Sequence, residues 1–322
     1  MNLKDKLDEF TYLNKTVKNS EVFKLGVTEY NLYAKFEFQL FGGSIKARAA
    51  YEILEDGINR GVINENTTII ESSSGNFAIA MSMFCKKLGL KFIAVVDILT
   101  NPNAIKFLKF FAHEVVVINE RDDRGGFLLN RLKYIKEYTS NNKNIYWTNQ
   151  YENECNYLAH YKYTAEEIIE QVPNLDIIFI GAGTCGTLSG VSRKLKEYNP
   201  KIKVVAVDVE GSSIFGLIPK TRFIPGMASS IKPPLLNRAL YDEIMIISEE
   251  EIIYSCYSLL EKHMIFGGGS CGAVFAAIER SFISSRIPLN SNVLFLCPDG
   301  GRFYIDTIYN KEWVKETYNI EI

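Results

Sequence analysis

The sequence has no long hydrophobic run. No stretch of its 322 residues approaches the roughly 18 to 20 consecutive apolar residues that cross a membrane as a helix. The amino end, from Met1 to Tyr12, is rich in charge and lacks the apolar segment of a secretory signal peptide. We therefore expect a cytoplasmic protein that does not associate with a membrane.

Histidine is scarce, and the cysteines lack metal-binding spacing. The three histidines are far apart, and no two cysteines form a Cys-x-x-Cys pair. Zinc sites usually contain such closely spaced pairs, so we expect neither a metal site nor a disulfide framework. The cysteines are expected to be small core residues in a reducing compartment. They are Cys85, Cys155, Cys185, Cys256, Cys271 and Cys297.

An excess of positive charge is also missing. The chain has 36 basic and 38 acidic residues, a formal net charge of −2, and no basic block. Binding to nucleic acid normally requires a basic patch, so we expect small-molecule partners instead.

What the sequence does contain is alternation of short apolar strands with amphipathic helices. This pattern predicts an α/β fold with parallel sheets joined by right-handed crossovers. The expected strands are Thr68–Glu71, Phe92–Asp97, Glu114–Ile118, Ile177–Gly181, Val204–Asp208, Ile244–Ile247 and Val293–Cys297. The expected helices are Ala47–Arg60, Asn76–Leu88, Pro102–Phe111, Gly126–Tyr138, Leu158–Gln171, Thr187–Tyr198, Glu249–His263 and Gly272–Ser285.

A polar break at Asn141–Lys143 divides this alternation. The length suits two domains that share one cleft. We expect a smaller, mobile α/β domain at 42–149. Residues 1–41 and 150–322 are expected to form a larger α/β domain.

One glycine-rich turn has the features of a phosphate site. Gly183, Thr184, Cys185, Gly186 and Thr187 follow an expected strand and open an expected helix. Backbone N–H groups and the helix dipole favour an anion at such a position. Two other interpretations stay open for this turn. Gly181, Gly183 and Gly186 have dinucleotide-turn spacing, with Asp208 as the acidic partner, and a tight turn without a ligand has the same composition.

A second turn, Ser73-Ser74-Gly75-Asn76, also follows a strand and opens a helix. Its hydroxyl and N–H groups suit a substrate carboxylate, and Asn76 can donate to a phenolic oxygen. An ordinary serine N-cap is the alternative.

Lys46 and Ser270 complete the set of candidates. Lys46 follows the paired glycines Gly42 and Gly43 at the expected start of a helix, where an amine could form a Schiff base. Ser270 precedes a helix rich in small residues and could bond the nitrogen of a pyridine ring. By themselves, the lysine could simply be solvated and the glycine-rich turn at Gly267–Gly272 could be a close-packed helix cap.

Taken together, these residues resemble the fold-type II pyridoxal phosphate enzymes, the cysteine synthase and cystathionine β-synthase superfamily. The matching pieces follow that family's order along nearly the whole chain. They are Gly43-Ser44-Ile45-Lys46-x-Arg48, Ser73–Asn76, Asn149-Gln150-Tyr151-x-Asn153, His160-Tyr161-x-x-Thr164-x-x-Glu167-Ile168, Gly183–Thr187, Gly269-Ser270-x-Gly272 and Pro298-Asp299-Gly300.

The resemblance implies a role for each matching position. Lys46 would form the Schiff base with pyridoxal 5'-phosphate and move the Cα proton, and Asn76 would bond the cofactor's phenolic oxygen. Gly183 to Thr187 would hold its phosphate, and Ser270 would meet its ring nitrogen. The substrate carboxylate would be bound by Ser73, Ser74 and Gln150. The family also implies a homodimer, with the cofactor in the cleft between the two domains.

A closer resemblance is to one branch, the N-(2-amino-2-carboxyethyl)-L-glutamate synthases of 2,3-diaminopropionate and siderophore biosynthesis. It is carried by Ile63–Thr67, Ile70–Asn76, Trp147–Tyr151, Ser192–Lys194, Gly211–Gly216, Pro225–Met227 and Leu236–Arg238. The branch implies a transferase that performs β-replacement on O-phospho-L-serine, with L-glutamate as the amine nucleophile. Arg131 and Lys232 are candidates for the anionic groups of these substrates, and Tyr151 is a further candidate contact.

Several positions depart from the family pattern. Leu40-Phe41 stands where the family has Asn-Pro, and Ala47 replaces an aspartate. Cys185 replaces a small residue of the phosphate turn, and Ala228 replaces a glycine. Three alternative functions therefore stay open: a cysteine synthase or cysteine lyase with a sulfur nucleophile, a non-catalytic binding or regulatory relative, and a nicotinamide-dependent oxidoreductase.

Overall fold

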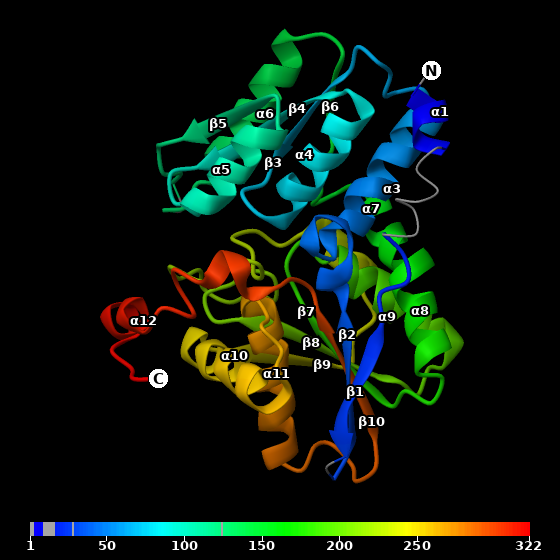
Figure 1. Ribbon diagram of the computed structural model, residues 1–322, viewed down its shortest axis with the longest axis vertical. Coiled ribbons are helices and arrows are strands. Elements are labelled where there is room, and N and C mark those ends of the chain that lie inside the picture. The colour runs from blue at the N-terminus through cyan, green and yellow to red at the C-terminus, as the bar shows by residue number, and fades with distance from the viewer. Residues whose placement is uncertain (1–2, 9–16, 28, 124) are drawn as a thin grey trace. The chain divides into compact units, whose positions relative to one another are not determined.

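The computed structural model describes residues 3–8, 17–27, 29–123 and 125–322, and the chain divides into two compact units (Figure 1). The first unit contains residues 1–18 and 40–156, and the second contains residues 19–39 and 157–322. Among the described residues, no helix has both the length and the apolar character of a membrane span.

The first unit is built on a four-stranded parallel sheet in the order β5-β4-β3-β6. The strands are β3 (Thr68–Ser72), β4 (Lys91–Asp97), β5 (Glu114–Ile118) and β6 (Ile145–Trp147). The helices are α1 (Leu3–Asp8), α3 (Lys46–Asn59), α4 (Asn76–Leu88), α5 (Pro102–Phe111) and α6 (Leu128–Asn141). A further helix, α7 (Glu154–Ala159), spans the boundary between the units.

The core of this sheet explains its apolar sequence. Ile70 of β3, Ile93 and Val95 of β4 and Ile135 of α6 form one buried cluster. Because helices cover the central strands on both faces, nearly every residue of β3 and β4 is buried, and each strand has an apolar centre, Ile69-Ile70 in β3 and Phe92–Val96 in β4.

The amino-terminal helix lies on the other side of the expected domain boundary. We expected residues 1–41 to join the larger domain, but α1 packs against α3 and α4 of the first unit. The Leu3 N–H donates to Glu65 Oε1 at 3.2 Å, and Lys6 Nζ donates to the Leu88 carbonyl oxygen at 3.2 Å. Residues 1, 2 and 9–16 of this segment lie outside the described residues.

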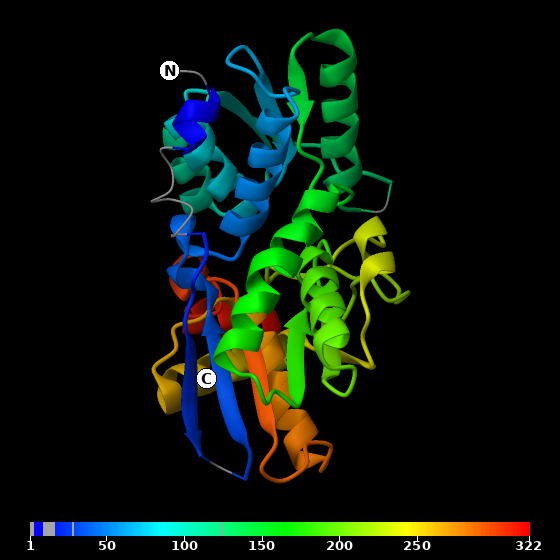
Figure 2. The same ribbon diagram turned by 90° about the vertical axis from the view of Figure 1, so that its right-hand side faces the viewer.

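The second unit contains a six-stranded sheet in the order β1-β2-β10-β7-β8-β9. The strands are β1 (Val22–Val27), β2 (Asn31–Phe36), β7 (Ile177–Gly181), β8 (Lys203–Val209), β9 (Glu243–Ile247) and β10 (Asn292–Cys297). Only β1 is antiparallel to its neighbour. Figure 2 shows the amino-terminal pair β1 and β2 beside the carboxyl-terminal strand β10.

Helices cover this sheet and carry two of the glycine-rich segments. They are α8 (Ala165–Gln171), α9 (Gly186–Tyr198), α10 (Glu249–His263), α11 (Gly269–Ile283) and α12 (Lys311–Tyr318). The expected two-domain α/β fold with parallel sheets is confirmed. All seven expected strands are present, with ends that differ by at most one residue.

Two of the expected helices differ in ways that bear on the candidate residues. The helix expected over Leu158–Gln171 is interrupted by a π-helical segment, His160–Thr164, which separates α7 from α8. In addition, α11 begins at Gly269, so Ser270 lies inside its first turn instead of before it.

A buried ion pair connects strand β2 to helix α8 in the second unit. Lys35 of β2 is fully buried, and its Nζ lies 2.8 Å from Glu167 Oε2 on α8. The same ammonium donates to the Ser20 carbonyl oxygen at 2.8 Å, and Ser20 Oγ donates to Glu37 Oε1 at 2.7 Å. The Lys35 ammonium is therefore paired with a carboxylate and hydrogen-bonded, which is the condition for burying a charge.

All six cysteines are free thiols and buried, which confirms their expected role as core residues. Burial raises the pKa of Cys85 and Cys256 because the thiolate would lose its hydration.

Candidate active site

In the first unit, the expected substrate residues lie at the carboxyl edge of the sheet. Ser73 and Ser74 follow β3, and Gln150 and Tyr151 follow β6, its hydrogen-bonded neighbour. The carboxyl ends of parallel strands share one edge, where open α/β sheets bind ligands. The structure brings these segments together, because Gln150 Nε2 donates to the Ser72 carbonyl oxygen at 3.3 Å.

A buried carboxylate that the sequence analysis missed lies beneath these two segments. Glu71 accepts hydrogen bonds from the Thr148 hydroxyl, from the Gln150 N–H at 3.1 Å and from the Ser72 N–H at 2.7 Å. Burial raises the pKa of Glu71, and these hydrogen bonds act in the opposite direction. In the sequence, Glu71 directly follows the apolar pair Ile69-Ile70 at the end of an expected strand, and this charged residue was the available signal.

Lys46 and Asn76 are the first residues of two helices that pack together, α3 and α4. Gly42 and Gly43, before Lys46, have φ of +74° and +77°, a conformation that favours glycine. The Lys46 N–H donates to Ser44 Oγ at 3.4 Å. Lys46 and Asn76 are both partly exposed.

Arg131 lies near the start of α6 and pairs with the end of β4. Its Nη1 is 3.2 Å from Asp97 Oδ2, and each side chain is only 13% exposed. The guanidinium Nε is buried and has no hydrogen-bond partner among the described residues. A buried N–H without a partner carries a desolvation cost that an anionic ligand would remove.

The turn between β7 and α9 in the second unit has the geometry of an anion site. Cys185 adopts a left-handed conformation with φ of +65°, and the 13-residue helix α9 begins at Gly186. The space around Gly183 is open, since a Cβ there would have its nearest neighbour, the Gly226 carbonyl oxygen, at 3.9 Å. Thr184 and Thr187 are partly exposed, so hydroxyl groups accompany the free N–H groups of the helix start.

Thr187 also contacts a buried histidine behind the turn. His160 Nε2 lies 3.2 Å from Thr187 Oγ1, and His160 Nδ1 lies 3.0 Å from Thr164 Oγ1. His160 belongs to one of the sequence pieces that carry the family resemblance, but no role was predicted for it.

Ser270 belongs to a hydrogen-bond network at the start of α11. Its hydroxyl donates to Asp299 Oδ1 at 3.1 Å, and the Tyr304 hydroxyl donates to Asp299 Oδ2 at 2.9 Å. Burial and the negative charge of Asp299 together raise the pKa of Tyr304. The Tyr304 hydroxyl also lies 3.4 Å from the Pro225 carbonyl oxygen, in the loop that borders Gly183. Ser270 is therefore connected, through Asp299 and Tyr304, to the loop that borders the turn at Gly183.

The dinucleotide interpretation of the β7–α9 turn loses its acidic partner. Asp208 is fully buried, and its Oδ1 accepts from the Val209 N–H at 2.8 Å. A carboxylate in this position cannot reach a ribose hydroxyl.

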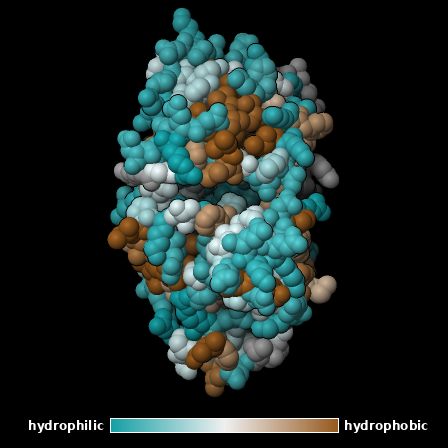
Figure 3. Space-filling view, turned by 90° about the vertical axis from the view of Figure 1, so that its left-hand side faces the viewer, coloured by the Kyte–Doolittle hydropathy of each residue, from teal (hydrophilic) through white to brown (hydrophobic). Residues whose placement is uncertain are grey.

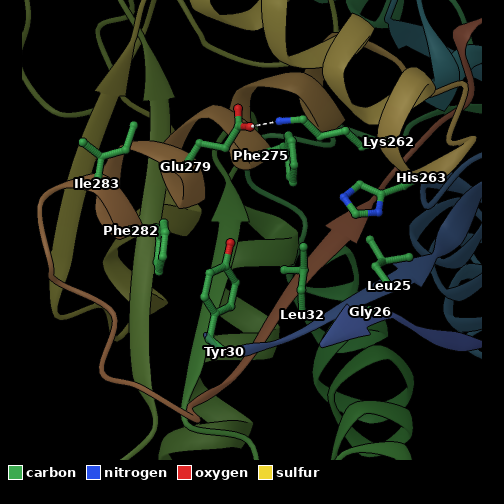
Figure 4. A pocket seen from close by; sticks show the side chains of 10 residues that line it. All are labelled: Leu25, Gly26, Tyr30, Leu32, Lys262, His263, Phe275, Glu279, Phe282 and Ile283. Carbon is green, nitrogen blue, oxygen red and sulfur yellow. Dashed lines mark hydrogen bonds and ion pairs between the residues drawn. The ribbon is translucent and has the colours of Figure 1, made fainter. Parts of the chain in front are cut away.

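A separate cavity of about 300 Å³ in the second unit contains none of the candidate residues (Figure 4). Its lining is mostly apolar and comes from β1, β2, α10 and α11, with Tyr30, Phe275 and Phe282 among its aromatic members. The Lys262–Glu279 ion pair at its rim, with Nζ and Oε1 3.1 Å apart, neutralises the charges that could attract an anion.

Comparison with known proteins shows which enzymes the chain resembles. The family model described as pyridoxal-phosphate dependent enzyme matches residues 16–299. The fold is similar to that of the O-acetylserine dependent cystathionine β-synthase from Helicobacter pylori, with a TM-score of 0.85 and 30% identity over 92% of this chain and 98% of that one.

Two other solved structures are similarly close. A hydrogen sulfide-producing enzyme from Fusobacterium nucleatum has a TM-score of 0.83 and 29% identity over 91% of this chain and 98% of its own. O-ureido-L-serine synthase has a TM-score of 0.82 and 25% identity over 95% of each chain.

Proposed function

From the premise that the chain belongs to the family of pyridoxal-phosphate dependent enzymes, we propose that it joins L-glutamate to the alanyl part of O-phospho-L-serine. The chain is a β-replacement-type enzyme related to cysteine synthase and cystathionine β-synthase. In the proposed reaction, the Cβ–O bond to phosphate breaks and the glutamate nitrogen forms a bond to Cβ. The product, N-(2-amino-2-carboxyethyl)-L-glutamate, would supply 2,3-diaminopropionate for siderophore biosynthesis.

We propose cofactor-binding roles for Lys46 and Asn76 of the first unit and for Gly183–Thr187 and Ser270 of the second. The fit is supported by the partial exposure of Lys46, the open space at Gly183 and the start of α9 at Gly186. Bound pyridoxal phosphate supplies an electron sink for negative charge at Cα. Ser270 bonds Asp299 in this structure, and its hydroxyl can rotate to meet a ring nitrogen.

The other residues would bind and orient the substrate. Ser73, Ser74 and Gln150 would hold the donor carboxylate through hydroxyl, amide and backbone N–H groups. Lys46 would remove the proton from Cα once the donor amine has displaced it. Glu71, by fixing Thr148 and the Gln150 backbone, keeps the carboxylate-binding segments in register.

The observation that carries the choice of donor is the buried, incompletely satisfied guanidinium of Arg131. A neutral acetyl leaving group has no need of such a cation, whereas a phosphate dianion does. Arg131 lies against Asp97, which ends β4 at the same sheet edge as Ser73.

The test uses purified enzyme with O-phospho-L-serine and L-glutamate. Mass spectrometry should detect the amine-linked product, and phosphate should be released in equal amount. Lys46→Ala should lose both the product and the visible absorption band of the bound cofactor. Formation of product only when sulfide replaces glutamate would falsify the assignment of the acceptor.

The second candidate is a β-replacement with a sulfur nucleophile. It is favoured by the similarity to an O-acetylserine dependent cystathionine β-synthase and to a hydrogen sulfide-producing enzyme. The acceptor comparison above separates the two candidates. The non-catalytic and nicotinamide-dependent alternatives are wrong, because the family and its neighbours are pyridoxal phosphate enzymes.

We also propose that the enzyme is a homodimer. Apolar side chains gather on the face of the first unit that carries α5 and β5 (Figure 3). Phe110 of α5 is 67% exposed and Val117 of the edge strand β5 is 37% exposed. Light scattering coupled to gel filtration should give twice the 36.6 kDa chain mass, and a mass of one chain would contradict the proposal.

A further inference from the structure

His160 is a fully buried imidazole directly behind the phosphate turn. It begins the π-helical segment His160–Thr164, and both of its ring nitrogens contact a threonine hydroxyl. Single π-helical turns inside helices are frequent at functional sites.

The close packing of α9 brings the imidazole to this position. A Cβ at Gly190 would lie 2.3 Å from the Tyr157 carbonyl oxygen and 2.7 Å from the Tyr161 nitrogen, so only glycine allows this approach. The Thr187 hydroxyl, one helical turn before Gly190, therefore lies 3.2 Å from His160 Nε2.

The protons in this row of three groups can be arranged in two ways if the imidazole is neutral. In the first, Nε2–H donates to Thr187 and the Thr164 hydroxyl donates to Nδ1. In the second, Nδ1–H donates to Thr164 and the Thr187 hydroxyl donates to Nε2. A hydroxyl has one proton to give, so only the first arrangement leaves the Thr187 proton available to a ligand.

A phosphate dianion in the turn accepts hydrogen bonds and has no proton to donate to the Thr187 oxygen. We infer that His160 is a positioning residue that donates from Nε2 to Thr187, turning the Thr187 proton toward the cofactor phosphate, while the Thr164 hydroxyl donates to Nδ1. The inference rests on the proposed placement of the phosphate at Gly183–Thr187.

The test measures cofactor binding instead of turnover. The full chain is freed of cofactor, and its dissociation constants for pyridoxal 5'-phosphate and for pyridoxal are compared in the wild type and in variants. Pyridoxal lacks the phosphate, so it reports contacts elsewhere in the site. The ³¹P chemical shift of the bound phosphate gives a second readout.

The variants separate hydrogen bonding from packing. His160→Phe removes both nitrogens, whereas His160→Gln retains a donor near the position of Nε2. We expect His160→Phe to weaken pyridoxal 5'-phosphate about 10- to 100-fold, as for the loss of one hydrogen bond to a charged group. Pyridoxal binding should not change, and His160→Gln should recover most of the loss. Thr164→Val, which keeps the imidazole, should give a smaller loss of the same kind.

Each outcome decides between the inference and its premise. If Thr187→Val leaves the affinity for pyridoxal 5'-phosphate unchanged, the phosphate does not lie at this turn. If Thr187→Val weakens it but His160→Phe and Thr164→Val do not, only the role of His160 is wrong. Equal losses for pyridoxal and its phosphate would also overturn the inference, because they would indicate a general disturbance of the fold.

Discussion

At the scale of single residues, the buried carboxylates differ in how completely they are hydrogen-bonded. Glu71 organises the ends of β3 and β6, and Asp299 bonds both Ser270 and Tyr304. Asp208 is different, because its Oδ2 is buried with no hydrogen-bond partner among the described residues. An unsatisfied carboxylate of this kind binds a proton more readily than one in water.

The effect of Asp208 on stability should depend on pH. Burial raises its pKa from 3.8 to about 6, in spite of the lowering effects of Ser212, Val209 and Arg222. Between these two values the folded chain holds more protons than the unfolded chain, so this contribution to the unfolding free energy falls as the pH rises. The cost of the charged form at pH 7 is on the order of 2–3 kcal/mol.

Asp208→Asn should remove this dependence. The unfolding free energy of the variant minus that of the wild type should be larger at pH 7 than at pH 4, as measured by chemical denaturation at both values. Using the difference between the two pH values cancels any constant cost of the new amide at Val209. An identical difference in unfolding free energy at both pH values would show that folding does not raise the pKa of Asp208.

Arg131 should control the choice of leaving group. We expect Arg131→Ala to raise the KM for O-phospho-L-serine by about 10- to 100-fold, since a hydrogen bond to a charged group contributes about 1.5–3 kcal/mol. The KM for O-acetyl-L-serine should change little. Lys232→Ala is the matched control, because Lys232 is exposed and was the other candidate cation. Equal effects on both donors would assign Arg131 a structural role only.

At the scale of elements, α9 combines a ligand-binding end with a tightly packed middle. Gly183 precedes the helix in open space, whereas Gly190 within it meets backbone atoms of the π-helical segment and its neighbours. The same residue type therefore serves two purposes a few positions apart.

Alanine substitutions should separate these purposes. Gly190→Ala forces backbone atoms apart and should lower the unfolding free energy by about 1–3 kcal/mol or more, as overpacking does. Gly183→Ala should leave the stability of the cofactor-free chain nearly unchanged and weaken cofactor binding by crowding the phosphate. Thermal unfolding without cofactor and a binding titration provide the two measurements. A stable Gly190→Ala variant would contradict the close approach of α9.

The elements also show how far the sequence could predict this structure. Strands such as β5 and β7 were predicted to the residue, because they are short apolar runs between turn signals. Strands β1 and β2 were missed, since charged residues such as Lys35 interrupt their apolar pattern. Lys35 can be buried because its ammonium pairs with the carboxylate of Glu167, more than 130 positions away. No local pattern in the sequence reveals such a pairing.

Site prediction shows the same division. Motif spacing nominated Lys46, Asn76, Ser270 and the phosphate turn, because each stands at the start of a helix or in the turn leading into one. The supporting residues Glu71 and Asp97 act through contacts with segments distant in sequence, so their roles emerge only when the strands are aligned side by side.

At the scale of the whole molecule, bound cofactor should stabilise the folded chain. A ligand at 100 times its dissociation constant stabilises the folded state by about 2.7 kcal/mol. The cofactor-loaded protein should therefore unfold at a higher temperature than the cofactor-free protein, as measured by calorimetry. Inorganic phosphate at the same concentration is the control. An unchanged unfolding temperature would argue against the proposed cofactor binding.

The strand order of the second unit has a consequence for biosynthesis. Strand β2 lies between β1 and β10, yet β10 is among the last strands that the ribosome makes. At about 5–20 residues per second, the β1–β2 hairpin must wait on the order of tens of seconds for this neighbour. Meanwhile the first unit, whose sheet is complete at Trp147, can already fold. The nascent chain thus exposes an open, largely apolar strand edge for most of its synthesis, which makes this hairpin the natural place for a chaperone to act.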